Sequence, residues 1–124
     1  MANLIRITVG SVSLKASLRE NETATAIFNA LPIEGQVNRW GEEIYFSIPV
    51  QLPESEDARD VMEVGELGFW PTGSSFCIFF GPTPVSQGSE PRAYSNVNPF
   101  GHVQGDATQF REVNDGEKII ISIA

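Results

Sequence analysis

Hydrophobic and polar residues alternate along much of the chain, which is the period of a half-buried β-strand. Near the start, Leu4–Val9 and Val12–Leu18 both follow this pattern, and Gly10-Ser11 separates them. Two alternating runs joined by a short glycine-containing turn predict a β-hairpin. Further strands are expected from the same pattern at residues 33–40, 42–50, 65–70, 74–80, 97–103 and 117–123.

One segment has a helical period instead. Its apolar residues recur at spacings of three and four, so they share one face of a helix: Ala24, Ile27, Phe28 and Leu31. Asn21 precedes this segment and is a typical N-cap, while Pro32 cannot continue a helix. The pattern therefore predicts one helix over residues 22–31. Residues 106–113 are expected to add one or two helical turns capped by Asp106.

The stretch Ser74 to Phe80 is apolar on both strand faces. If Phe76, Ile78 and Phe80 point into the core, then Cys77 and Phe79 must point the other way, because successive side chains alternate. Such a strand should be covered on its second face as well. A helix, a loop or a bound ligand could supply that cover.

Strands without regularly intervening helices argue against a doubly wound parallel sheet. We predict a mainly β protein, a closed β-barrel of about eight strands with one or two short helices. Closure would remove the sheet edges, and a helix could plug one end of the barrel. The length of 124 residues and the lack of a linker predict a single domain over residues 1–124.

Composition and charge narrow the classes of partner. The formal net charge is -8, so phosphate backbones would be repelled and no nucleic-acid partner is expected. No apolar run approaches the roughly 20 residues that span a bilayer, and the first residues do not resemble a signal peptide, so no membrane partner is expected. The single cysteine cannot form an internal disulfide, which suits a reducing, cytoplasmic location.

The order of motifs in the second half is similar to that of the cyclophilin fold. The chain contains GELGFWPTGSSFCIFFG, then NPFGHVQGD, and finally GEKIIISIA. With the earlier segments TATAIFNALPIEG and RWGEEIYFSIPV, the whole chain resembles a small prokaryotic cyclophilin-like family, a minimal version of the barrel whose function is not established.

The resemblance implies a peptidyl-prolyl cis-trans isomerase, an enzyme that lowers the barrier of about 20 kcal/mol to rotation about an X-Pro bond. Cyclophilins use an arginine on a strand that corresponds to residues 42–50, and this strand contains none. The nearest is Arg39. The glutamine and phenylalanine of the cyclophilin pocket fall near Ser75 and Cys77, and its tryptophan and histidine fall near residues 94–97, which contain neither type. Whether the protein is an enzyme therefore stays open.

Strand parity defines a candidate ligand-binding groove on the outer face. In each strand, the residues between the inward-facing aliphatic positions should point outward. These residues are Glu43, Tyr45, Trp70, Cys77 and Phe79. Trp40 could be turned toward the same groove by Gly41, and the rigid prolines Pro82 and Pro84 could form a wall. An apolar groove with one carboxylate suits a small molecule or a short peptide, including a proline-containing one. The alternative is that the helix or the 81–91 loop covers these residues.

Two other uses of the same surface stay open. In a divergent enzyme, Glu43 would be the acid/base and the weak catalytic candidate, with Tyr45 or His102 as an electrostatic partner. In a homo-oligomer, the aromatic surface would be a subunit interface. No metal site is expected, because the chain has one histidine and one cysteine, and no nucleotide fingerprint indicates a cofactor.

Overall fold

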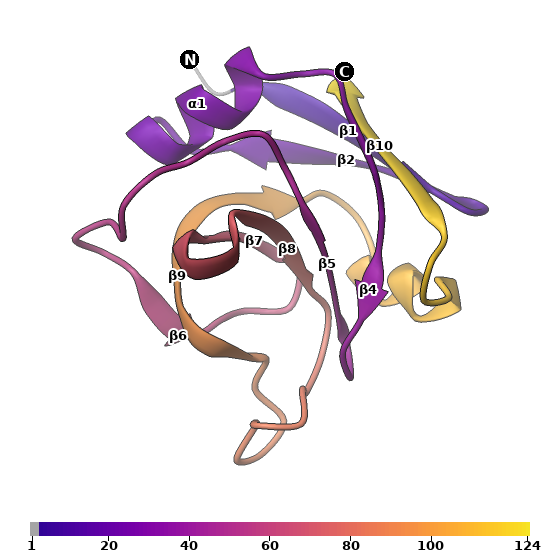
Figure 1. Cartoon of the computed structure of the whole chain (residues 1–124). Helices are drawn as coiled ribbons and strands as arrows, with labels where there is room; N and C mark the ends of the chain where they lie inside the picture. Colours follow the sequence, from indigo (N-terminus) through magenta and orange to yellow (C-terminus); the bar gives the residue numbers. More distant parts are fainter. Residues whose placement is uncertain (1–2) are drawn as a thin grey trace.

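Antiparallel hydrogen-bond ladders organise the chain into one large sheet (Figure 1). The chain also forms the helix α1 and two short 3₁₀ segments. The computed structural model describes residues 3–124. The first elements are β1 (Leu4–Val9), β2 (Val12–Leu18), α1 (Glu22–Asn29), β3 (Ile33–Gln36), β4 (Asn38–Arg39) and β5 (Glu43–Ser47). The remaining ones are β6 (Arg59–Val61), β7 (Glu66–Trp70), the 3₁₀ turn η1 (Pro71–Gly73), β8 (Ser75–Phe79), β9 (Arg92–Val103), the 3₁₀ helix η2 (Ala107–Glu112) and β10 (Lys118–Ile123).

The strand order is β3-β10-β1-β2-β9-β7-β8-β5-β4, and β6 pairs with β9 beside this path. The mainly β class is thus correct, but the closed barrel is not confirmed. Within residues 3–124 no ladder joins β3 to β4, although the two strands follow one another in the chain. Val37 lies between them and exchanges backbone hydrogen bonds with the turn before β10, through Glu117 O and Gly116 N.

The predicted hairpin is confirmed. β1 and β2 pair in register from Leu4↔Ser17 to Val9↔Val12, and Gly10 adopts a positive φ of 56° in the turn. A positive φ costs glycine nothing because it has no Cβ. The hairpin therefore places Ile5 and Ile7 on one face, where both are fully buried.

A large apolar cluster fills the inner, concave face of the sheet. It contains Phe76, Ile78 and Phe80, the predicted inward set of the apolar run, together with the buried residues of β1, β2 and β10. Phe76 stacks on Phe46 at 5.3 Å and meets Phe100 edge-on at 5.0 Å. Inner-facing parity along the strands is thus as the alternation predicted.

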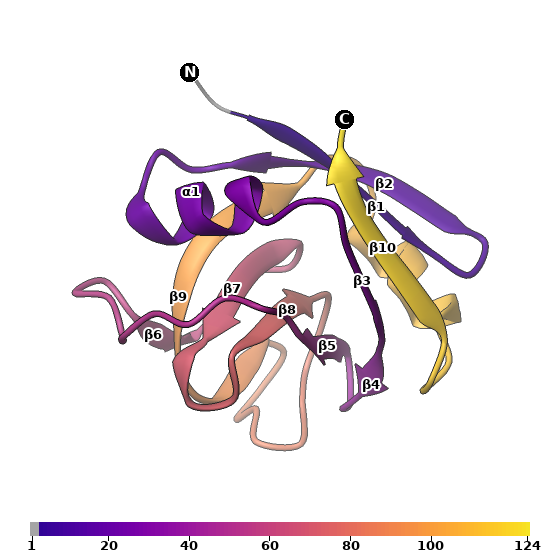
Figure 2. The same cartoon turned by 45° about the horizontal axis from the view of Figure 1, so that its top comes forward.

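The helix α1 packs against this inner cluster through Ala24 and Ile27 and lies beside β9 (Figure 2). Asn21 caps it as predicted, because its side chain accepts a hydrogen bond from Ala24 N at 2.8 Å. The helix ends at Asn29, two residues earlier than predicted, since the residue before a proline is disfavoured in the helical region. The described chain has one cis peptide, Leu31-Pro32.

Two strands differ from the prediction, and both matter for the candidate site. β9 begins at Arg92, five residues before the predicted strand, and curves along the sheet (Figure 1). Its second half pairs with β2 and β7, while its first half pairs with β6, a three-residue strand in a segment where no strand was predicted. The β6–β9 pair thus forms a second layer beside β7 and β8.

Candidate functional site

A smaller apolar cluster lies on the outer face of the sheet, opposite the inner one. Its buried members are Met62, Cys77, Phe79, Ala93 and Val97, with Tyr45 and Trp70 packed against them. The second face of the apolar run in β8 is therefore covered by β6 and the first half of β9, and not by α1. A strand buried on both faces accounts for the continuous apolar sequence.

Gly68 allows this cover to approach the sheet closely. It lies on β7 opposite Cys77 of β8. A Cβ atom at Gly68 would lie 2.6 Å from Val97 Cγ2 and 3.3 Å from Met62 Cε. Only glycine therefore lets the β6–β9 pair rest directly on this face.

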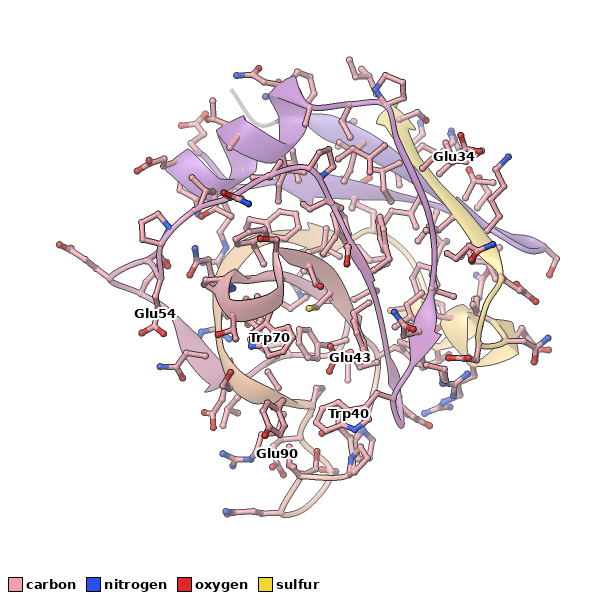
Figure 3. All side chains as sticks on the ribbon, viewed as in Figure 1. Glu34, Trp40, Glu43, Glu54, Trp70 and Glu90 are labelled. Atoms are coloured by element: carbon pink, nitrogen blue, oxygen red, sulfur yellow. The ribbon has the colours of Figure 1, made fainter. Side chains whose placement is uncertain are left out.

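The outer cluster is incomplete at one end, and a pocket of about 240 Å³ opens there. The pocket is lined by Trp40, Glu43, Tyr45, Trp70, Cys77, Ala93, Tyr94 and Val97. Figure 3 shows the two tryptophans and Glu43 gathered on one side of the molecule, far from Glu34. The lining comes from β5, β7, β8 and β9 and from the turn before β5, so tertiary packing alone assembles it.

Aromatic rings form most of the pocket wall. The ring of Tyr94 meets that of Trp70 at a centroid distance of 6.2 Å and an interplanar angle of 85°, and that of Trp40 at 6.3 Å and 73°. The indole Nε1 of Trp70 donates a 2.7 Å hydrogen bond to Ser95 Oγ, which fixes the ring. Tyr94 remains 74% exposed and so lies at the mouth.

A tight turn positions Trp40 at the pocket. Trp40 N donates to Glu43 O at 2.9 Å, and Glu43 N donates back to Trp40 O at 3.2 Å. Gly41 has a φ of 59° in this turn, and a Cβ there would lie 2.9 Å from Pro84 Cδ. Pro82 O accepts a hydrogen bond from Glu42 N at 2.9 Å. The two prolines thus support the turn from behind and do not line the pocket.

Among the described residues that line the pocket, Glu43 is the only acidic or basic one. The residue is 5% exposed, and its Oε1 is buried without a hydrogen-bond partner among residues 3–124. Burial raises the pKa of this carboxyl to about 8, and an interaction with the Cys77 thiol opposes the shift only weakly. Glu43 is thus mostly protonated at neutral pH.

The other buried carboxylate shows a contrasting solution. Glu66 is fully buried, but Arg59 forms an ion pair with it and Arg19 Nη2 lies 3.0 Å from its Oε2. Burial favours a raised pKa, yet the hydrogen bond from Arg59 and the nearby charges hold the pKa of Glu66 below its ordinary value. The fold therefore neutralises the Glu66 carboxylate, whereas Glu43 has no ionic partner among residues 3–124.

Cys77 forms part of the pocket floor. It lies opposite Tyr45 in the β5–β8 register, and its residue is 2% exposed. Burial, together with the nearby Glu43, raises the pKa of the Cys77 thiol well above its usual value. A thiol that stays protonated is a poor nucleophile, so Cys77 contributes shape and an apolar surface.

Two residues considered from the sequence lie elsewhere. Arg39 donates hydrogen bonds to the carbonyls of Gly41, Arg111 and Val113, and its guanidinium lies 5.1 Å from the centre of the Phe80 ring. His102 lies 3.7 Å from Glu63 at the surface and is paired with β2 and β7. Neither side chain lines the pocket, so neither can act on a molecule bound there.

The structure brings together five of the eight residues proposed for ligand binding: Trp40, Glu43, Tyr45, Trp70 and Cys77. Phe79 is fully buried within the outer cluster, and Pro82 and Pro84 lie behind the turn. The sequence reasoning missed Ala93, Tyr94 and Val97. The resemblance to cyclophilins had placed a pocket tryptophan and histidine near residues 94–97, but these residues contain neither type. Tyr94 is the aromatic residue there that could have indicated the pocket. The ligand-binding role of the whole set stays a prediction.

In residues 3–124 no group of three or more histidine, cysteine, aspartate or glutamate side chains is placed to hold a metal ion. Among the described helices, none has the length and apolar character needed to cross a bilayer.

Comparison with known proteins identifies the class. Residues 3–122 match the family described as Cyclophilin-like, so the chain belongs to the cyclophilin-like family. Among solved structures, it is similar to the solution structure of the hypothetical protein AF2241 from Archaeoglobus fulgidus. The two share 36% sequence identity and superpose with a TM-score of 0.84, over 99% of this chain and 95% of that one. No curated protein gave a significant match.

Proposed function

We propose that the protein is a binding module for a small molecule, which it holds in the outer-face pocket. The observation that carries the proposal is the pocket itself, about 240 Å³ lined by aromatic side chains around one buried carboxyl oxygen that has no hydrogen-bond partner in the described part of the chain. Ligand sites are typically apolar cavities with few, well-placed polar groups. This volume lies below the roughly 300 Å³ at which drug-sized ligand pockets begin, so it suits a small ligand.

A short peptide is the less favoured occupant. A peptide must find partners for its backbone N–H and C=O groups, usually along a sheet edge or from polar side chains. The lining offers one carboxyl and two phenol groups, and its β5 and β8 backbones already pair with one another. Proline-containing peptides are therefore the comparison set in the experiment.

The two tryptophans give a direct readout, because they are the only ones in the chain and both line the pocket. A library of small molecules and a set of proline peptides would be titrated into ¹⁵N-labelled protein while the two indole N–H resonances are followed. We expect some small molecules to shift both resonances with saturation. Ala93→Leu, which adds side-chain volume inside the pocket, should abolish the shifts. Ala58→Leu, outside the pocket, is the matched control.

Saturable shifts in the wild type that persist in Ala93→Leu would place binding elsewhere and contradict the proposal. A peptide series that saturates the resonances while no small molecule does would replace the proposed ligand class. An absence of any saturable shift across both sets would remove the binding function altogether.

A second candidate function is a divergent enzyme with Glu43 as general acid/base. One observation favours it: the pKa of about 8 lies close to neutral pH, where a proton-transferring group is most effective. Tyr45 is the phenol on the same strand that also lines the pocket. A carboxyl titration that gives Glu43 an ordinary value near 4.5 would remove the reason for this candidate.

A further inference from the structure

The pocket walls have the composition of an aromatic box. Trp40, Tyr45, Trp70 and Tyr94 line it, and the ring of Tyr94 is close to perpendicular to both indoles. The rings meet edge to face, and the pocket of about 240 Å³ opens beside them. The face of an aromatic ring is the negative end of its quadrupole, so such a box attracts cations, and tryptophan does so most strongly.

The polar end of the box is also suited to a cation. Glu43 is only 5% exposed, and its Oε1 has no hydrogen-bond partner among the described residues. A buried polar atom in this state needs an explanation, and a ligand that supplies the missing partner is one. The contrast with Glu66, which receives two arginines, shows that this fold can pair a buried carboxylate internally.

Residues 3–124 supply Glu43 with no positively charged side chain. No lysine, arginine or histidine occurs among the lining residues of the described chain. Arg39 is held by three backbone carbonyls, and Arg92 on β9 is held by Glu90 at 3.0 Å and Asp60 at 3.3 Å. The net charge of -8 further favours the approach of a cation over that of an anion.

Inorganic cations and simple amines fit the lining poorly. A divalent metal ion prefers several oxygen ligands, and no group of three potential ligands occurs in the residues described. An unsubstituted –NH₃⁺ group has three donors to satisfy, but the lining offers few acceptors. Alkyl groups on the nitrogen remove donors and add apolar surface, which the aromatic walls can cover.

Resting on the proposed function, we infer that the ligand is a small organic cation with an alkylated ammonium head. The aromatic side chains of Trp40, Trp70 and Tyr94 surround the head, and the Glu43 carboxylate pairs with its charge. The pocket volume of about 240 Å³ suits a free small molecule of about the size of choline.

Binding of such a cation is linked to a proton. Because burial raises the pKa of Glu43 to about 8, the carboxyl is mostly neutral at pH 7 and must ionise to pair with the ligand. The titratable groups that face it are Tyr45 on its own strand, Cys77 on β8 and Tyr94 on β9. For a ligand with a permanent charge, the affinity should rise about fiftyfold from pH 6 to pH 8, as the carboxyl loses its proton.

Calorimetric titration with choline chloride tests this inference, with 3,3-dimethyl-1-butanol as the neutral ligand of the same shape. At pH 8 we expect choline to bind wild-type protein at least tenfold more tightly than the alcohol. Glu43→Gln should remove this preference and the pH dependence. Glu42→Gln should retain both, since Glu42 pairs with Arg111 at 2.9 Å outside the pocket.

The outcomes separate the ligand class from the binding function. Equal affinities for choline and the alcohol would overturn the cation inference and leave the pocket as a binding site. Tight choline binding that Glu43→Gln does not weaken would also overturn it. If neither compound binds while library molecules shift the indole resonances, only the cation inference falls. If no compound shifts them, the proposed function falls as well.

Discussion

Replacing Glu43 by glutamine should stabilise the protein increasingly as the pH rises. The carboxyl has an ordinary pKa of 4.5 in the unfolded chain and a pKa of about 8 in the folded one. Between these values the unfolded chain gains free energy by releasing a proton that the folded state must retain. The free energy of unfolding is therefore unaffected by Glu43 ionisation below pH 4.5, and it decreases progressively between pH 4.5 and pH 8.

The magnitude follows from the two pKa values. At pH 5 the linkage destabilises the folded state by about 1 kcal/mol, and at pH 8 by about 4 kcal/mol, because each pKa unit corresponds to about 1.4 kcal/mol. Glutamine has nearly the same shape but does not ionise. The advantage of Glu43→Gln over wild type should thus grow by about 3 kcal/mol across this interval.

Urea unfolding at pH 5, 6, 7 and 8, followed by tryptophan fluorescence, measures this difference. Glu42→Gln is the control, because it removes a carboxylate one residue away whose ion pair with Arg111 lies at the surface. Such pairs contribute about 0–1 kcal/mol. The reasoning is refuted if the difference between Glu43→Gln and wild type is the same at pH 5 and pH 8.

Four further predictions concern packing and function. Gly68→Ala should destabilise the protein by about 1–3 kcal/mol in urea unfolding, because its Cβ would lie 2.6 Å from Val97; an unchanged midpoint would contradict the close approach. Asn21→Ala should cost about 1 kcal/mol through loss of the α1 cap, and an unaltered stability would mean that the 2.8 Å bond to Ala24 N contributes nothing. A protease-coupled prolyl isomerase assay should show only the uncatalysed rate, and turnover abolished by Arg39→Ala would overturn this. Sedimentation should give a monomer, whereas an oligomer that Tyr45→Ala dissociates would assign the pocket surface to a subunit interface.

Strand alternation and helix-capping residues predicted those elements that depend on neighbouring positions in the sequence. Alternation placed Ile44 and Phe46 inward and Tyr45 outward on β5, because the strand period is two wherever one face is buried. The cap at Asn21 was readable for a similar reason, since it depends on residues three positions apart. The same parity argument identified four of the eight pocket residues before their strands had been paired, and the Gly41 turn suggested a fifth, Trp40.

The remaining part of the site depends on long-range packing that one sequence does not encode locally. β6 is three residues long and polar, so its pairing with β9 leaves no period to detect. Without that pair, Ala93, Tyr94 and Val97 had no predicted place beside the groove. Phe79 was assigned to the groove by parity, but parity cannot show that Met62 and Val97 cover it. The closed barrel was inferred from edge protection, and the ladder ends at β3 and β4 instead.

The central claim is that the buried carboxyl of Glu43, which has no ionic partner among residues 3–124, lines the aromatic pocket and binds a cationic ligand there. A ¹³C NMR titration of the Glu43 side-chain carboxyl, with and without saturating choline, tests it most directly. We predict a pKa of about 8 in the free protein and a clearly lower value with choline bound. An ordinary pKa near 4.5 that choline leaves unchanged would contradict the account.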